Sequence, residues 1–266
     1  MIKPRRIAGT DLSVSPLGFG TVKLGRDQGV KYPEHFKIPD DREALNLLSL
    51  AHELGMSLLD TAPAYGNSEE RLGKLFAENK GLRHQWIICS KVGEEFENGQ
   101  SRFDFSPEHI RFSVERSLKR LNTDVIDMML AHSSGDDVRI IEQSGCLETL
   151  ADLKKEGKIR ATGMSTKTVE GGILALQKSD MAMVTYNLNE QGEKPVLDYA
   201  LANNKGILVK KALASGHACL EGQDPVRESM KLVFSHPAVS SAVVGTINPV
   251  HIRQNIAVCL EVLSNL

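Results

Sequence analysis

Strand-like runs alternate with helical patterns along the whole chain, and this alternation constrains the fold more than any other feature. Eight runs rich in apolar residues recur about every 30 residues. Several are continuously apolar, as expected of parallel strands covered on both faces. The runs cover Ser15–Gly20, Ser57–Asp60, Trp86–Lys91, Ile126–Leu130, Ala161–Ser165, Met181–Tyr186, Ile207–Lys211 and Ser241–Gly245.

Helix start signals lie between these runs. Ser106–Pro107, Asp224–Pro225 and Asn248–Pro249 each place a capping side chain before a proline at the first helical position. Asn67 with Glu70 resembles a capping box. Eight strand-then-helix units of this kind predict an α/β fold, a single (β/α)8 TIM barrel that occupies residues 1–266 as one domain.

An open Rossmann sheet is the alternative fold. Against it, no Gly-x-Gly-x-x-Gly follows the first run: Gly18 and Gly20 are followed by Leu24-Gly25, and we expect no helix to open there. The segment from Arg6 to Ser15 is predicted to form an N-terminal β-hairpin that plugs the bottom of the barrel.

Composition excludes several functional classes. The net charge is −2 and the pI about 6.5, so bulk nucleic-acid binding is not indicated. Cys89, Cys146, Cys219 and Cys259 lie far apart, which fits a reduced, cytoplasmic compartment. No signal peptide, membrane-spanning run, zinc-ligand spacing or P-loop is found, so neither a membrane nor a metal partner is expected.

Four chemically active residues stand at or just after three consecutive predicted strands: Asp60, Tyr65, Lys91 and His132. Strand ends meet at one mouth of a barrel, where such folds keep their chemistry. A nearby ammonium from Lys91 is expected to lower the pKa of Tyr65, and Asp60 to hold Lys91 charged. His132 could donate a hydrogen bond to a carbonyl oxygen. Each residue alone is more simply structural, but the four together predict a proton-donating tyrosine site.

The motifs around these residues resemble the aldo-keto reductase superfamily over essentially the whole chain, and most of all its short bacterial members similar to the potassium-channel β-subunit branch. The resemblance implies NAD(P)H-dependent reduction of an aldehyde or ketone, with Tyr65 as proton donor, Lys91 and Asp60 as its tuning pair, and His132 orienting the substrate. The matching motifs are Leu17-Gly18-Phe19-Gly20-Thr21, Asp60-Thr61-Ala62-Pro63-Ala64-Tyr65-Gly66, Ser90-Lys91-Val92-Gly93, Ala131-His132-Ser133, Gly163-Met164-Ser165, Tyr186-Asn187, and Val244-Gly245-Thr246 through Asn255.

The same resemblance implies a cofactor extended across the barrel mouth, NADPH being expected and NADH not excluded. Thr166 and Met183 stand where an asparagine and a glutamine usually bind the carboxamide, and Lys210 replaces an aromatic residue. Gly245 and His251 stand at usual lysine and arginine positions of the 2′-phosphate site. The implied cofactor residues are Gly20, Thr21, Asp60, Ser165, Thr166, Met183, Lys210, Lys211, Ala212, Leu213, Ser215, Gly216, Gly245, Thr246, Asn248, His251 and Asn255.

Two other functions stay open. One is a Schiff-base aldolase that uses Lys91 as nucleophile. The other is a cofactor-sensing, catalytically weak partner protein. The sequence does not predict an oligomeric state. The chain ends soon after its last predicted helix, so we expect loops 26–39 and 93–106 to wall the pocket for a small carbonyl substrate, with Phe96, Phe103 and Phe105 as apolar walls.

Overall fold

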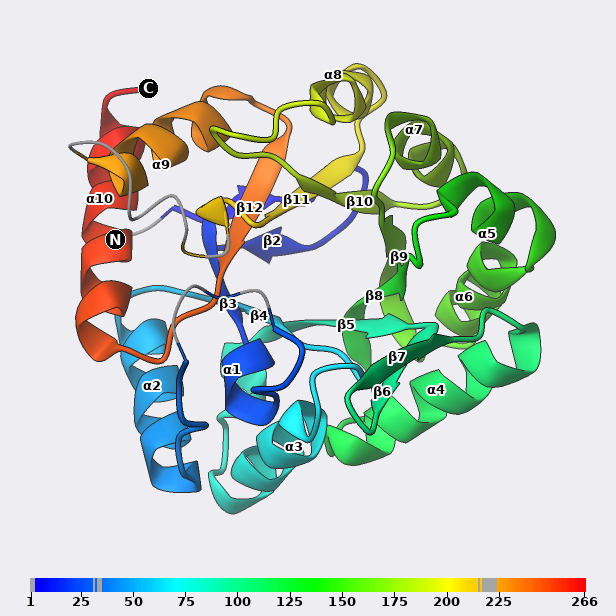
Figure 1. Cartoon of the computed structure of the whole chain (residues 1–266), viewed down its shortest axis with the longest axis horizontal. Helices are drawn as coiled ribbons and strands as arrows, with labels where there is room; N and C mark the ends of the chain where they lie inside the picture. Colours follow the sequence, from blue (N-terminus) through cyan, green and yellow to red (C-terminus); the bar gives the residue numbers. More distant parts are fainter. Residues whose placement is uncertain (1–2, 31, 33–34, 215, 217–223) are drawn as a thin grey trace.

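A closed barrel of parallel strands forms the centre of the protein (Figure 1). This computed structural model describes residues 3–30, 32, 35–214, 216 and 224–266. Neighbouring strands pair in parallel all the way around, and β9 pairs with β10 to complete the ring. The barrel strands are β3 (Leu17–Gly20), β4 (Leu58–Asp60), β5 (Ile87–Val92), β8 (Ile126–His132), β9 (Ile159–Ser165), β10 (Met181–Thr185), β11 (Gly206–Lys210) and β12 (Val239–Val244).

Helices surround the strands, as Figure 1 shows. The predicted caps at Ser106, Asp224 and Asn248 are confirmed, since each side chain accepts a hydrogen bond from a backbone amide of its first turn. Asn67 makes no such bond, so the predicted capping box there is wrong. The helices are α1 (Val22–Gly25), α2 (Asp41–Glu53), α3 (Ser68–Glu78), α4 (Pro107–Arg120), α5 (Asp137–Gln143), α6 (Cys146–Lys155), α7 (Val169–Lys178), α8 (Lys194–Ala202), α9 (Pro225–Ser235) and α10 (Pro249–Ser264), with a 3-10 turn at Arg83–Gln85.

The (β/α)8 barrel and all eight predicted strands are confirmed, with ends within two residues of those expected. Two local expectations were wrong. A one-turn helix, α1, does open after β3, too short to make a Rossmann unit. The segment after β5 is not an irregular loop: β6 (Glu94–Glu97) and β7 (Gln100–Phe103) form an antiparallel hairpin.

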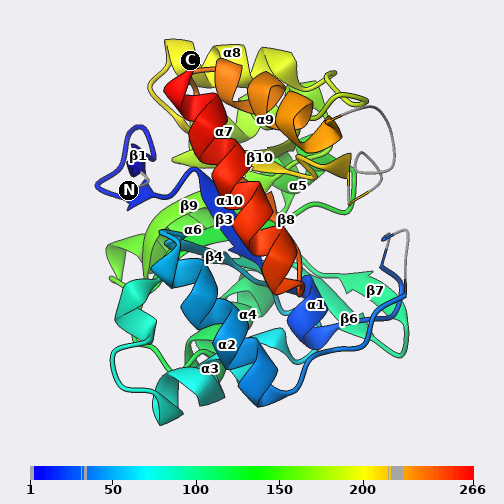
Figure 2. The same cartoon turned by 90° about the vertical axis from the view of Figure 1, so that its left-hand side faces the viewer.

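The predicted N-terminal hairpin is confirmed as β1 (Arg5–Arg6) paired antiparallel with β2 (Ser13–Val14). Figure 2 shows it on the opposite side of the barrel from α1, β6 and β7. Its side chains Ile7, Leu12 and Val14 are buried in one cluster with inward-facing strand residues such as Leu58 and Met128. The hairpin therefore supplies the apolar filling of the barrel bottom and leaves the other end open. None of the described helices is long and apolar enough to cross a membrane.

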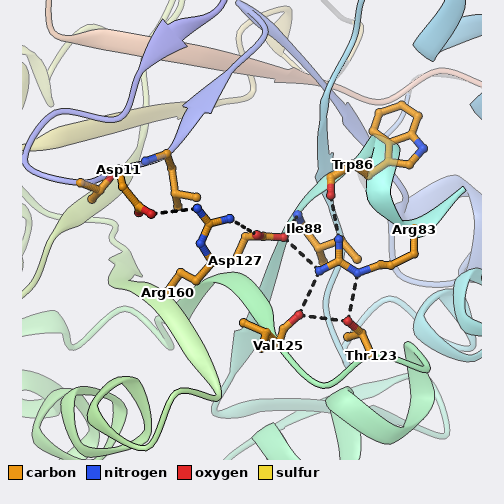
Figure 3. Close-up of polar contacts among 10 residues, drawn as sticks. Asp11, Arg83, Trp86, Ile88, Thr123, Val125, Asp127 and Arg160 are labelled. Carbon is orange, nitrogen blue, oxygen red and sulfur yellow. Dashed lines mark hydrogen bonds and ion pairs between the residues drawn. The ribbon is translucent and has the colours of Figure 1, made fainter. Parts of the chain in front are cut away.

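A buried carboxylate ties the strands together at the bottom of the barrel (Figure 3). Asp127 in β8 accepts hydrogen bonds from the Ile88 amide at 2.9 Å, from Arg83 at 3.1 Å and from Arg160 at 2.8 Å. Arg160 reaches on to Asp11 beside the hairpin at 2.9 Å. One side chain thus joins β5, β8, β9 and the plug, because its two oxygens satisfy two guanidinium groups and an amide.

Asp127→Ala is expected to lower the free energy of unfolding by about 3 kcal/mol, because it leaves a buried amide and a largely buried arginine without their acceptor. Urea denaturation followed by circular dichroism measures this loss. Asp124→Ala, an exposed acid in the same segment, is the matched control and should unfold like the wild type. Equal midpoints for the two variants would show that the network adds no stability.

Candidate active site

The structure brings Asp60, Tyr65, Lys91 and His132 together at the open end of the barrel. All four line one cleft of about 560 Å³ at the carboxyl ends of the strands. Asp60 ends β4, Lys91 is the fifth residue of β5, and His132 ends β8. A parallel barrel places these ends on one rim, which is why residues far apart in the chain meet here.

Tyr65 is held by a close packing of backbone against α1. The Tyr65 amide donates to the Ala62 carbonyl at 3.0 Å, which forms a turn after β4. Gly66 has a φ of +62°, and a Cβ there would lie 2.1 Å from the Gly25 carbonyl oxygen. Arg26 locks the turn by donating to the Ala64 carbonyl at 2.9 Å. The glycine at position 66 is therefore required both by its backbone angle and by this contact.

Lys91 and Asp60 form a buried ion pair. Lys91 Nζ lies 2.7 Å from Asp60 Oδ1 and donates to the Thr61 carbonyl at 2.9 Å, with only 1% of the lysine side chain exposed. Thr21 holds the Asp60 backbone in turn, since its amide and its hydroxyl both donate to the Asp60 carbonyl at 2.9 Å. Burial favours a neutral amine, but the Asp60 carboxylate outweighs it, and the pKa of Lys91 lies above its ordinary value.

The Tyr65 hydroxyl donates to Asp60 Oδ2 at 3.5 Å, and the Lys91 ammonium lies 4.7 Å from the centre of the ring. Burial raises the pKa of Tyr65 strongly; Lys91 lowers it, and Asp60 raises it again. Lys91 does lower the pKa of Tyr65, as expected, but the effect of burial is larger. The prediction that the pKa of Tyr65 would be lowered overall is therefore wrong for the structure without a ligand, because desolvation of the phenolate costs more than the ammonium returns.

His132 packs edge-on against Tyr65, with ring centres 6.4 Å apart. Its Nδ1 atom lies 2.6 Å from Glu94 Oε2, a partner that the sequence did not suggest. Burial lowers the pKa of His132, and the Glu94 carboxylate opposes this shift while Lys91 and Lys210 add to it.

Most residues expected at the cofactor line the same cleft. Thr21 and Thr166 are fully buried and do not; the Thr166 hydroxyl donates to Glu193 at 3.4 Å instead. Asn248 is not in the lining, and its side chain caps α10. Ser215 lies outside the described residues. The expected residues in the lining are Gly20, Asp60, Ser165, Met183, Lys210, Lys211, Ala212, Leu213, Gly216, Gly245, Thr246, His251 and Asn255.

Lys210 bridges to the end of β9. Its ammonium donates to the Ser165 hydroxyl at 2.8 Å and to the Thr166 carbonyl at 2.6 Å, and burial lowers its pKa to about 8. Lys211 has a left-handed φ of +56°, and its carbonyl accepts from the buried Asn187 side chain at 3.0 Å. Lys210 therefore reaches the end of β9, while the backbone of Lys211 is held in the turn that follows β11.

Tyr32 in the lining belongs to loop 26–39, which was expected to wall the pocket, whereas Lys23 and Gln254 line it without having been predicted. Lys23 lies 4.0 Å from the Tyr32 ring centre, and burial raises the pKa of Tyr32 to about 12. Lys23 and Tyr32 do not stand at the end of a predicted strand, so the sequence did not single them out as site residues. The three phenylalanines expected as pocket walls, Phe96, Phe103 and Phe105, are absent from the described lining: Phe96 packs under Arg26, and the other two stack on each other.

In the ranges that the structure describes, no cluster of histidine, cysteine or carboxylate side chains could hold a metal ion. The polar side chains of the cleft include lysines, two tyrosines, amides and hydroxyls, with Asp60 as its carboxylate. Such a set suits an elongated organic anion with a carbonyl compound beside it.

The sequence model described as the Aldo/keto reductase family matches residues 16–225. The aldo-keto reductase YhdN of Bacillus subtilis is 34% identical over 215 residues, 79% of this chain and 62% of YhdN. The NADH-specific methylglyoxal reductase of Escherichia coli is 31% identical over 206 residues, 73% of this chain and 59% of that enzyme. The chain thus spans about three fifths of the length of these two relatives.

A solved structure resembles the chain over nearly its full length. The Pseudomonas aeruginosa protein PA4992, assigned to the aldo-keto reductases, is 58% identical with a TM-score of 0.89, and the match covers 98% of this chain and 95% of that one.

Asp60→Asn is expected to lower the free energy of unfolding at pH 7 by about 3 kcal/mol, because Lys91 loses its buried partner. The sign of the pH dependence also changes. In the wild type the raised pKa of Lys91 contributes stability below the ordinary lysine value, which is lost as pH rises through the folded-state pKa. In the variant, burial is no longer opposed by the Asp60 carboxylate and depresses the pKa of Lys91. The unfolded chain then binds more protons than the folded chain, so stability rises with pH.

Urea unfolding at pH 7 and pH 9 measures this difference. The variant should gain stability relative to the wild type at the higher pH, and Asp124→Asn, an exposed control, should not. A pH-independent deficit in Asp60→Asn would contradict the assignment of a charged Lys91.

Proposed function

Because the chain belongs to the aldo/keto reductase family, we propose that it is an NADPH-dependent oxidoreductase that reduces an aldehyde or ketone to an alcohol. The observation that carries the proposal is the convergence of Tyr65, Lys91, Asp60 and His132 in one cleft. A phenol hydroxyl bonded to a carboxylate, with a buried ammonium beside its ring, is a proton donor with a built-in means of stabilising its conjugate base.

A nicotinamide cofactor, when bound in this cleft, would supply the hydride that the carbonyl carbon takes up. Tyr65 gives its hydroxyl proton to the carbonyl oxygen. Lys91 then stabilises the phenolate, because its ammonium is fixed by Asp60 and cannot move away. The His132 ring packs edge-on against the Tyr65 ring, where it can orient the substrate oxygen. Burial of these side chains excludes water, and the electrostatic contacts between them are stronger as a result.

The chain's own residues fit an extended dinucleotide. Ser165, Met183 and Lys210 line one part of the cleft, where a carboxamide group needs polar partners. Met183 offers only a weak sulfur acceptor, and the Lys210 ammonium, 2.8 Å from the Ser165 hydroxyl, supplies a donor there. The turn after β11, held by Asn187, lies beside Lys211 and suits a diphosphate.

The 2′-phosphate of NADPH is proposed to lie at the start of α10. This helix begins at Pro249, and its first amides and dipole favour an anion. Thr246 and His251 line the cleft at this end, and a Cβ on Gly245 would lie 3.1 Å from the Tyr32 hydroxyl, so the glycine lets the Tyr32 side chain approach the backbone here. The NADH-specific enzyme of Escherichia coli shows that relatives differ in this choice.

The geometry disfavours the aldolase alternative. A Schiff base requires a neutral, accessible amine, whereas Lys91 is 1% exposed and donates to two oxygens. A cofactor-sensing protein without turnover would keep the same cleft, so activity measurements distinguish it from a reductase.

Tyr65→Phe is expected to lower kcat/KM for carbonyl reduction by about 10²- to 10⁴-fold, since the proton donor is lost in the chemical step. Lys91→Met should also slow reduction strongly. NADPH affinity, followed by quenching of protein fluorescence, should stay nearly unchanged in Tyr65→Phe. Wild-type turnover in either variant would overturn the roles proposed for these residues. Tight NADPH binding with no turnover across a broad carbonyl panel would favour the cofactor-sensing protein.

His251→Ala is expected to weaken NADPH binding roughly fivefold and to leave NADH binding unchanged, because only NADPH carries a phosphate for this side chain to contact. Steady-state kinetics with both cofactors measures the effect on their kcat/KM ratio. Val250→Ala, an exposed neighbour on the same helix turn, is the control. A wild-type enzyme that uses NADH as well as NADPH would contradict the cofactor assignment.

A further inference from the structure

Glu94 is fixed against His132 by contacts at both of its carboxylate oxygens. Oε2 lies 2.6 Å from His132 Nδ1, and Oε1 accepts a hydrogen bond from the Ser101 hydroxyl at 2.6 Å. Glu94 opens β6 and Ser101 belongs to β7, so the hairpin that follows β5 presents this carboxylate to the site. The Nδ1 atom is buried, and its contact with Glu94 is a close ion-pair distance without hydrogen-bond geometry, while the ring lines the cleft with 21% of the side chain exposed.

The charge state of the pair follows from its surroundings. Burial raises the pKa of Glu94, but His132, Ser101 and the guanidinium of Arg26 outweigh it and bring the pKa to about 2. Glu94 is therefore an anion at neutral pH. An anionic oxygen and the lone pair of an unprotonated nitrogen repel each other at 2.6 Å, so the contact favours the forms of His132 that carry a proton on Nδ1.

We propose that Glu94 is a positioning residue that keeps a proton on Nδ1 of His132 and leaves Nε2 as the ring nitrogen facing the cleft. The inference rests on the proposed reduction, in which His132 contacts the substrate oxygen. A carboxylate that fixes the tautomer of a working histidine acts by the same physics at metal sites and in hydrolases.

The consequence is a histidine whose role changes with pH. When His132 is neutral, its proton is on Nδ1 and Nε2 can only accept a hydrogen bond, which suits an alcohol. When the ring is charged, Nε2 also carries a proton and can donate to a carbonyl oxygen. Three charged groups face the ring from other elements: Glu94 on β6 favours the charged form, while Lys91 on β5 and Lys210 on β11 oppose it.

The first test needs no turnover. Proton–nitrogen correlation NMR on protein labelled with ¹⁵N-histidine reports the tautomer and the pKa of each of the 8 histidines, and His132→Gln identifies the signal. Neutral His132 in the wild type should carry its proton on Nδ1. Glu94→Gln removes the negative charge beside the ring, so the pKa of His132 should fall by about 1 unit or more. Glu97→Gln, on the exposed end of the same strand, should change neither.

A neutral wild-type His132 protonated on Nε2 would overturn the inference without any variant, and so would an unchanged pKa of His132 in folded Glu94→Gln. The second test is kinetic. In the wild type, kcat/KM for reduction should fall about tenfold per pH unit above the measured pKa of His132, and in Glu94→Gln this fall should begin at a lower pH, in step with the lowered pKa. A wild type with the expected tautomer that reduces no carbonyl would refute the proposed function alone.

Discussion

The buried pair of Lys91 and Asp60 is the interaction on which the open end of the barrel depends. A lysine with 1% exposure is tolerable only next to an anion, and the carboxylate lies 2.7 Å away on the neighbouring strand. Because both residues are at strand ends, the pairing of β4 with β5 sets the geometry of the site. Thr21 fixes the Asp60 backbone from the strand on the other side. The arrangement that would serve catalysis is thus also a condition for folding.

The two ends of the barrel manage buried charge in different ways. At the bottom, both oxygens of Asp127 accept hydrogen bonds, from Arg83, Arg160 and the Ile88 amide. At the mouth, the Tyr65 hydroxyl makes a long contact of 3.5 Å with Asp60, and His132 lines the cleft. A polar group without a hydrogen-bond partner is costly in a core, but it is useful where a ligand binds and supplies the partner. The bottom therefore specifies the fold, and the mouth retains hydrogen-bonding capacity for a substrate.

The sequence predicted the strands well because a parallel barrel strand is an apolar run of fixed length, and it predicted the four central residues because strand ends converge. It did not predict what depends on tertiary contact. The hairpin of β6 and β7 has a polar pattern with no buried apolar side chain to reveal it, so Glu94 went unnoticed. The pKa of Tyr65 was expected to fall because the sequence shows the nearby cation but not the depth of burial. Thr166 turned inward to Glu193, an interaction between residues 27 positions apart.

Opposite charges alternate through the site, and this order explains how so many ionisable groups share a small volume. Asp60 pairs with Lys91, and His132 lies between the cation of Lys91 and the anion of Glu94; beyond it, Arg26 stacks on Phe96 at 3.3 Å and contributes to the low pKa of Glu94. In such a series each group sets the pKa of the next. A pH profile of the enzyme would then report coupled titrations that belong to the cluster and not to one residue. The assignment of a kinetic pKa to Tyr65 or His132 therefore requires a direct measurement on that side chain.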